Sequence, residues 1–406
     1  MSKKTKVLLG LGILITALSM RMPITASGAL TGIVRADLGL SGAQAGFLTT
    51  LVVLVFAVAS PFIGGFSDRF GMNRVLLVGL AFIVTGQLVR VSGAWQMLFL
   101  GTGILALGIT AANVLMPPLV RYAFPRAVGL WTSAYLSLMN FANSIAAGLT
   151  LPLANRPGWS WRPAMLVWVS FGLVALVIWL LLAKKPMAAR RPSTDLAASK
   201  QGKGGGSLAK EPIVWAIMAF MGFQSMIFYS YITWMPTLLL DRGLSSEQVG
   251  LLVFLFQFFS IPTSFVTPMI AERLSDQRIL GMFSGLFYAF GFGVMFFFPQ
   301  ASMPLLVAVM ISMGFGSGTT ISIAMLLFNV RTPDVSTAAR LSGLAQSAGY
   351  LMAGVGPVAI GRAYDSFGDW RWPLAFLTFA ALVVALTGYL GGRDRLVASV
   401  QGPTDK

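Results

Sequence analysis

The sequence predicts an all-α membrane protein with twelve transmembrane helices in two pseudo-symmetric six-helix bundles. Of its 406 residues, 56% are hydrophobic and only 10% are charged, whereas a soluble domain carries about 25% charged residues. Hydrophobic runs of about 18 residues or more recur along the chain, and each is long enough to cross a bilayer as a helix. These runs do not alternate between apolar and polar residues, as the strands of a membrane β-barrel would.

Twelve hydrophobic runs stand out between polar loops. We predict spans over 7–34, 44–66, 74–94, 96–120, 128–153, 163–183, 212–240, 248–270, 279–299, 302–328, 341–364 and 372–392. The long segment between the sixth and seventh spans is basic and contains a glycine-rich stretch, which is typical of a flexible linker. The predicted domains are an N-terminal bundle over 1–183, a cytoplasmic linker over 184–210, a C-terminal bundle over 211–392 and a cytoplasmic tail over 393–406.

The basic residues fall mainly on one side of this predicted topology. The side that holds the N-terminus carries 21 of the 29 Lys and Arg residues, the opposite loops carry 6, and Arg21 and Arg90 lie within spans. Because basic residues collect in cytoplasmic loops, we expect both termini in the cytoplasm and the protein in the inner membrane of a bacterium. This distribution accounts for most of the net charge of +16 without a nucleic-acid partner.

The two halves of the chain resemble each other. Matching features are Gly129-Leu130 with Gly343-Leu344, Trp161-Arg162 with Trp370-Arg371, and the loop 64–74 with the segment 268–278. The offsets of 214, 209 and 204 residues are nearly constant. A duplicated half is the expected signature of a transporter that moves two bundles about a central site.

The loop 64–74 reads GGFSDRFGMNR and resembles the motif between the second and third spans of major facilitator transporters. The matching residues are Gly64, Asp68, Arg69, Gly71 and Arg74, and the second copy keeps Glu272, Arg273 and Arg278 but has Pro268 in place of the glycine. Glycine permits a close helix approach and a tight turn, and the charged residues can pair with helix ends or neighbouring spans. The motif is interpreted as a conformational latch, and the alternative is a merely stable short loop.

A finer resemblance extends over nearly the whole chain. Segments similar to the cyanate and 2-nitroimidazole transporter family, within the major facilitators, are LSMRMPITASGAL at 18–30, GQLVR at 86–90, NVLMPPLVRYAFP at 113–125, FMGFQSMIFYSYITWMP at 220–236 and LSGLAQSAGYLMAGVGP at 341–357. The resemblance implies the major facilitator fold and a substrate of cyanate or nitroimidazole size.

Arg21 lies 14 residues beyond Val7 in the first predicted span, which is about 21 Å along a helix. A charge at such depth costs at least ~2.5 kcal/mol, so it should face the interior of the bundle. We interpret Arg21 as an anion-binding residue of the central site. The alternative is a buried structural arginine that binds carbonyl groups freed by Pro23. For Arg90, near the outer end of the third span, we favour a side chain that extends to the membrane interface.

The middles of the predicted spans contain no acidic residue, and the chain contains no His or Cys. All 13 Asp and Glu residues fall in loops or near helix ends, whereas proton-driven exporters of cations need a carboxylate within the membrane. Residues 129–152 contain no Gly-Pro pair and residues 98–112 contain no charge, which also argues against a multidrug cation exporter. The chain has no His and no Cys, and neither a catalytic site nor a phosphate-binding loop is found, so we expect no enzyme and no cofactor.

Polar residues within the spans complete the predicted substrate site. They are Asn113, Tyr135, Asn140, Gln224, Tyr229, Trp234, Gln346 and Tyr350. A buried amide or phenol needs a partner, and a neighbouring helix is as good a partner for any one of them as a ligand.

The sequence therefore predicts a secondary transporter that moves a small anionic or polar solute across the cytoplasmic membrane by alternating access. The alternatives are an exporter of a drug or metabolite on the same fold, and a transporter-like receptor that binds a ligand without moving it. We expect a monomer in a lipid bilayer that binds a small-molecule substrate, carried alone or in symport with a proton.

Overall fold

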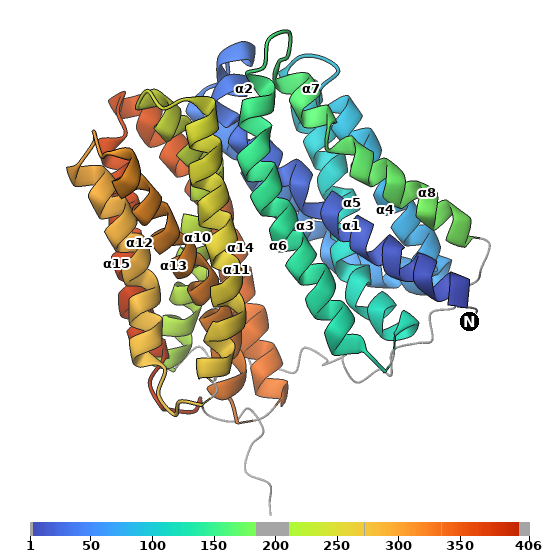
Figure 1. The fold of residues 1–406 in the computed structure, drawn as a ribbon. Helices are drawn as coiled ribbons and strands as arrows, with labels where there is room; N and C mark the ends of the chain where they lie inside the picture. Colours follow the sequence, from blue (N-terminus) through green and yellow to red (C-terminus); the bar gives the residue numbers. More distant parts are fainter. Residues whose placement is uncertain (1–2, 125, 184–210, 272, 334, 398–406) are drawn as a thin grey trace, which may run out of the picture. The chain divides into compact units, whose positions relative to one another are not determined.

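The computed structural model describes residues 3–124, 126–183, 211–271, 273–333 and 335–397, and nearly all of them are helical (Figure 1). The predicted all-α fold is confirmed. The first helices are α1 (Lys3–Ala29), α2 (Thr31–Leu38), α3 (Gly42–Phe70), α4 (Met72–Val89), α5 (Trp95–Ala123), α6 (Val128–Ala154), α7 (Trp161–Leu166) and α8 (Val169–Ala183). The later helices are α10 (Pro212–Asp241), α11 (Ser246–Ala271), α12 (Arg278–Phe297), α13 (Met303–Val330), α14 (Val335–Phe367) and α15 (Arg371–Gly391).

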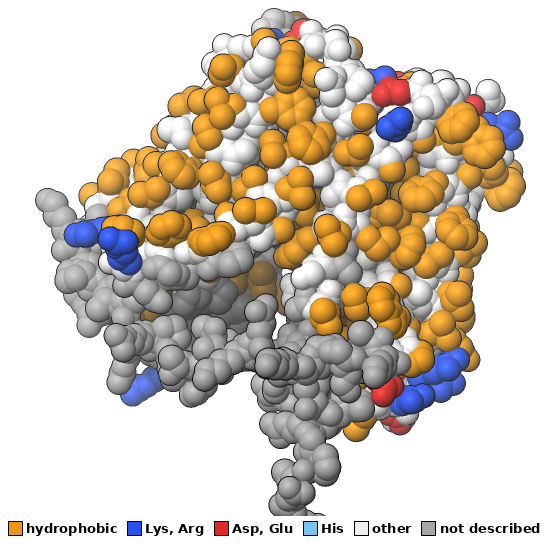
Figure 2. Space-filling view, turned by 180° about the vertical axis from the view of Figure 1, so that it is seen from behind, with side chains coloured by type: hydrophobic (Ala, Val, Ile, Leu, Met, Phe, Trp, Pro, Cys, Tyr) orange, Lys and Arg blue, Asp and Glu red, His pale blue; other side chains and the backbone are white. Residues whose placement is uncertain are grey.

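These helices follow the predicted spans in order. Within the described residues, 11 segments are long and apolar enough to cross a membrane. The remaining predicted span, 341–364, corresponds to α14, which has 33 residues. Figure 2 shows that hydrophobic side chains dominate the face in view, while the charged side chains gather near its margins. The protein is therefore a multi-pass membrane protein. The predicted linker 184–210 lies outside the described residues, as does the tail beyond residue 397.

Two predicted spans are interrupted. The first was expected to run over 7–34, but α1 ends at Ala29 and the short helix α2 follows. Asp37 of α2 accepts hydrogen bonds from Trp161 Nε1 at 2.7 Å and from Arg162 at 3.1 Å, so α2 is tied to the start of α7. The span predicted over 163–183 consists of α7 and α8, which meet at residues 167–168.

The chain folds into two compact units. Unit 1 comprises Met1–Pro192 with Ile232–Phe254, and unit 2 comprises Ser193–Tyr231 with Leu255–Lys406. The boundaries cut through α10 and α11, so the first residues of α11 and the last of α10 belong to unit 1. The predicted domains over 1–183 and 211–392 stay a prediction.

Close helix packing through small residues characterises unit 1. A Cβ atom on Gly86 of α4 or Gly101 of α5 would lie 2.6 Å from the carbonyl oxygen of the other. Helices in membranes associate through such small residues because lipid gives little hydrophobic drive to bury large ones. Buried hydrophobic residues of α1, α3, α4, α5, α6 and α8 form the main core of this unit.

Arg331 follows the last residue of α13. It lies at the end of unit 2 that the predicted topology places on the cytoplasmic side. Its side chain is only 2% exposed and pairs with Asp394 at 3.1 Å. It also donates to the carbonyl oxygens of Gly392 at 2.9 Å and Ser275 at 3.2 Å, and to Gln277 Oε1. Burial lowers the pKa of Arg331, and its hydrogen bond to Asp394 opposes that shift. Arg331 thus joins the α11–α12 loop to the residues after α15.

Replacement of Arg331 by Met is expected to destabilise the protein by roughly 3 kcal/mol, because it leaves several buried acceptors without their donor. Asp394 is 63% exposed, so Asp394→Asn should cost no more than ~1 kcal/mol. Denaturation of both variants in mixed micelles measures the difference. Equal stabilities for the two variants would contradict a central role for Arg331.

Candidate functional site

Arg21 lies on a face of α1 that also carries Thr25 and Gly28. Spacings of four and three residues place the three on one stripe of the helix. Thr25 Oγ1 donates to Asn143 Oδ1 at 2.6 Å, and a Cβ on Gly28 would lie 2.5 Å from the carbonyl oxygen of Ile232. Arg21 is half-buried, and the described residues provide it with no hydrogen bond or ion pair. This stripe therefore presents a guanidinium whose donors are not used by the described part of the protein.

Asn140 of α6 lies at nearly the same level as Arg21. A Cβ on Gly10 of α1 would overlap the ring of Trp131 on α6, and the bond from α1 to Asn143 lies further along both helices. The two helices therefore run parallel. Arg21 lies four residues before Thr25, and Asn140 lies three residues before Asn143, to which Thr25 is bonded. Asn140 is also half-buried.

Three other predicted residues belong to unit 1. Tyr135 is 6% exposed and is part of the core that α1, α5 and α6 share. Asn113 of α5 is half-buried. Trp234 is 2% exposed and follows Thr233, whose hydroxyl bonds Thr49 at 2.8 Å. Unit 1 thus provides five of the nine predicted residues, with Arg21 as their only charge.

In unit 2, close packing brings α10 and α14 together near Gln224. A Cβ on Gly349 would lie 3.2 Å from Met221 and 3.5 Å from Ser225 Oγ, so Tyr350 lies near the level of Gln224. Gln224 is 3% exposed, and its amide donates to Ser225 Oγ at 2.8 Å.

The remaining predicted residues of unit 2 are less enclosed. Tyr229 and Gln346 are half-buried, whereas Tyr350 is 37% exposed. The four predicted site residues of unit 2 lie on the adjoining helices α10 and α14, and their role at a substrate site stays a prediction.

The residues of the predicted latch are described only in part. Gly71 has a φ of 86° between α3 and α4, a conformation that favours glycine. Arg69 and Arg74 are exposed, and Arg69 lies over the ring of Phe70 at 5.3 Å. Nothing is described for the side chain of Asp68 or for Gly64 beyond their helix.

In the second copy of the motif, Arg278 pairs with Asp276 at 3.1 Å. Arg273 is exposed, and Glu272 lies outside the described residues. The pair joins a loop residue to the first residue of α12, two positions later, so it does not by itself link neighbouring spans.

The expectation for Arg90 is wrong. Its side chain does not extend to the interface: it is 1% exposed. Its Nη1 donates to the carbonyl oxygen of Pro23 at 3.1 Å and to Ser27 Oγ at 2.8 Å. Arg90 thus binds the carbonyl of Pro23 itself, one turn beyond the carbonyl that the missing N–H of Pro23 frees.

Sequence reasoning missed the polar partners of α1. Ser27 follows Pro23 by four residues, and Asn143 follows Asn140 by three, so both lie one helical turn from a residue that was identified. The spacing was therefore a usable signal. What it could not show was which neighbouring helix each would meet.

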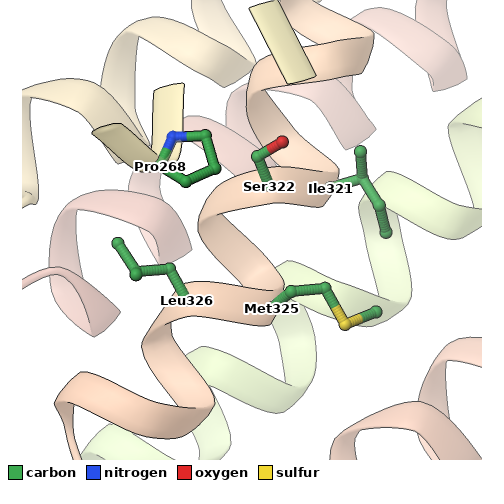
Figure 3. Close-up of a pocket in the computed structure, with 5 residues that line it drawn as sticks. All are labelled: Pro268, Ile321, Ser322, Met325 and Leu326. Atoms are coloured by element: carbon green, nitrogen blue, oxygen red, sulfur yellow. The ribbon is translucent and has the colours of Figure 1, made fainter. Parts of the chain in front are cut away.

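A pocket of about 320 Å³ lies in unit 2 and is lined by Pro268, Ile321, Ser322, Met325 and Leu326 (Figure 3). Pro268 has no N–H, which leaves the carbonyl of Ser264 without its helical donor. The Ser322 hydroxyl donates to that carbonyl at 3.1 Å. Because the one polar lining residue is already engaged, this pocket offers nothing to hold an anion.

Within the described ranges, no group of three Asp or Glu side chains could hold a metal ion. The sequence contains no His or Cys that could replace them. The predicted site residues provide a guanidinium, amides, phenols and an indole, groups that can bind a polar solute by hydrogen bonds.

Comparison with known sequences gives relatives that are transporters. An uncharacterised transporter of Bacillus subtilis, YycB, is 36% identical over 95% of this chain and 94% of its own length. The 2-nitroimidazole transporter of Escherichia coli is 33% identical, with 97% and 98% covered. The cyanate transport protein CynX of E. coli is 23% identical, with 90% and 92% covered.

Solved structures share the fold at low sequence identity. The nucleoside transporter NupG has a TM-score of 0.77 at 13% identity, with 93% of this chain and 98% of that chain covered. A D-xylose–proton symporter has a TM-score of 0.73 at 14% identity, with 95% and 96% covered. The sequence pattern of the Major Facilitator Superfamily matches residues 9–357. The chain therefore belongs to the Major Facilitator Superfamily, in the transporter family that includes the 2-nitroimidazole and cyanate transporters of E. coli.

Proposed function

We propose that this secondary transporter carries a small anionic or polar solute by alternating access, and that Arg21 binds the solute. The observation that carries the proposal is the half-buried guanidinium of Arg21, which has no described partner within the protein. An unpaired charge inside a membrane protein is costly, and a bound anion would relieve that cost. The names of two relatives, a 2-nitroimidazole transporter and a cyanate transport protein, support a substrate of this size.

The neutral residues would shape the site around the solute. Asn140 lies near the level of Arg21, and Gln224 with Tyr350 provides an amide and a phenol in unit 2. Amides both donate and accept hydrogen bonds, so they suit either an anion or a polar neutral ring. Asn113, Tyr135, Tyr229, Trp234 and Gln346 are proposed as further lining residues.

Export of a drug or metabolite is the alternative on the same fold. The described carboxylates lie close to helix ends, as Asp241 and Glu247 do, so they do not offer a cation site within the membrane. This favours an anionic or neutral substrate. A proton that accompanies transport would then travel with the substrate or on a group outside the spans.

Binding of cyanate and 2-nitroimidazole to the purified protein tests the proposal directly. Each compound is added at fixed ionic strength, with chloride and unsubstituted imidazole as controls, and affinity is measured by calorimetry. We expect saturable binding of at least one compound, together with uptake into proteoliposomes. If the protein neither binds nor takes up either compound, the proposal of a substrate like those of the two relatives is contradicted.

We also propose that both termini and the linker face the cytoplasm, because 21 of the 29 basic residues lie on that side of the predicted topology. The chain has no natural cysteine, so Ser2→Cys, Ser207→Cys and Thr404→Cys each introduce a single thiol. A membrane-impermeant maleimide should label these only in opened cells, whereas Ser92→Cys, in the exposed turn after α4, should be labelled in intact cells. Labelling of position 207 from outside would overturn the two-bundle topology.

A further inference from the structure

Arg90 is a deeply buried arginine that belongs neither to the predicted substrate site nor to the predicted latch. It lies at the end of α4 and is 1% exposed. Both of its described hydrogen bonds end on α1, at the Pro23 carbonyl and at Ser27 Oγ. An arginine with this burial is expensive to keep in a membrane, so its contact with α1 calls for a functional reason.

The contact falls on the helical turn of α1 that begins at Pro23. Pro23 lacks an N–H and its ring opposes the preceding turn, so it breaks or kinks a helix unless other groups support it. Here α1 continues as a helix to Ala29. The Ser27 hydroxyl donates to the Pro23 carbonyl at 3.2 Å, and Arg90 binds both groups. Arg90 and Ser27 thus brace the turn 23–27.

Arg90 is itself held firmly. Gly101 of α5 packs so closely on α4 that a Cβ there would lie 2.7 Å from the Arg90 Cα. One turn earlier, Gln87 is 1% exposed, and α8 covers it, since a Cβ on Gly172 would lie 3.8 Å from its Nε2. The backbone that carries Arg90 therefore has little freedom to move away from α1.

Arg21 lies on the other side of the braced turn. At 3.6 residues per turn, it is roughly 160° around the helix from Pro23 and about 120° from Ser27. Arg90 thus holds the back of the helix whose front presents Arg21 and Thr25. A bend of α1 at Pro23 would shift or rotate Arg21 relative to Asn140 and the rest of unit 1.

We propose that Arg90 is a positioning residue of the substrate site: it binds the Pro23–Ser27 turn and thereby fixes where the guanidinium of Arg21 lies. This inference rests on the proposed binding role of Arg21. It assigns no ligand contact to Arg90 itself. Ser27 acts with it, as the second acceptor on α1.

The first test is a double-mutant cycle with Arg90→Gln and Arg21→Gln, using cyanate as the probe. Loss of a hydrogen bond from a charged donor should displace the turn, and we expect Arg90→Gln to weaken cyanate binding about tenfold in the folded protein. In the Arg21→Gln background the same change should add nothing, because residues that act as a unit are not additive. Arg90→Lys should restore part of the affinity, and Ser27→Ala should lose less than Arg90→Gln. Thr85→Ala, an exposed hydroxyl on α4 bound only to its own helix, is the matched control.

Full affinity in a folded Arg90→Gln variant, or losses that simply add, would overturn the inference. If Arg21→Gln alone leaves cyanate binding intact, the proposed function fails instead, and a second measurement still decides about Arg90. In that measurement Arg21→Cys carries a spin label, and Arg90→Gln should alter the mobility and water accessibility of the label. An unchanged spectrum would show that Arg90 does not set the position of residue 21.

Discussion

Arg21→Gln is expected to weaken cyanate binding roughly a hundredfold while the protein still folds. The half-buried guanidinium has no described partner in the protein, so its removal leaves no described acceptor unpaired. A hydrogen bond to a charged group is worth up to ~3 kcal/mol, which corresponds to about two orders of magnitude in affinity. Glutamine retains hydrogen-bond donors near that position, so the difference reports mainly on the charge.

A comparison with Arg21→Lys separates an anionic from a neutral ligand. Lysine keeps the charge but loses the planar paired donors of arginine, so cyanate affinity should fall less than in Arg21→Gln. For 2-nitroimidazole in its neutral form, the two variants should lose similar amounts. Affinities from calorimetry, with the melting temperature of each variant, distinguish these patterns.

A purely structural role for Arg21 predicts a different result for folding and for cyanate affinity. Both variants would fold poorly, and the surviving protein would bind cyanate normally. The structure gives the carbonyl-binding role near Pro23 to Arg90 instead, so we expect Arg21 variants to melt close to the native protein. Native affinity in a well-folded Arg21→Gln protein would end the anion-site proposal.

The fold could be predicted from the sequence because membrane spans are set by length and hydropathy alone. The segment 212–240 predicts α10 (Pro212–Asp241) nearly to the residue, since Glu211 and Arg242 bound its apolar run. The break after Ala29 could not be predicted in this way. The short helix after the break is held by a hydrogen bond between Asp37 and Trp161, which are 124 residues apart in the chain.

The site was less predictable for a related reason. A charged residue in a span marks a place of interest, but the sequence does not say which helix its side chain meets. Arg21 and Arg90 were both recognised as charges within spans. Their surroundings differ because close packing at Gly86 and Gly101 carries Arg90 against α1, and such packing is invisible before the helices are placed.

The contact between α6 and the first half of α11 gives the last prediction. Both segments belong to unit 1. A Cβ on Gly250 of α11 would overlap the carbonyl oxygen of Gly148 on α6, and a Cβ on Gly148 would lie 3.0 Å from the Cβ of Phe254. Backbone cannot yield to an added methyl group as a flexible side chain can, so the contact requires glycine at position 250 more strictly than at 148.

Gly250→Ala should therefore impair transport, by about fivefold to a hundredfold in turnover, if overpacking costs ~1–3 kcal/mol at a contact that forms in the cycle. Gly148→Ala should impair it less. Helix propensity acts in the opposite direction, because alanine favours a helix over glycine by about 1 kcal/mol, so a loss cannot come from a weakened helix. Gly103→Ala on α5 is the matched control, since a Cβ there meets nothing within 4 Å.

Turnover in proteoliposomes, with cyanate affinity measured in parallel, checks this order of effects. Arg21 lies on another helix, so affinity in the Gly250→Ala protein should change far less than turnover. That separation would indicate that the α6–α11 contact takes part in the transport cycle and not in substrate binding. Equal turnover in all three alanine variants would mean that the α6–α11 contact does not take part in the cycle.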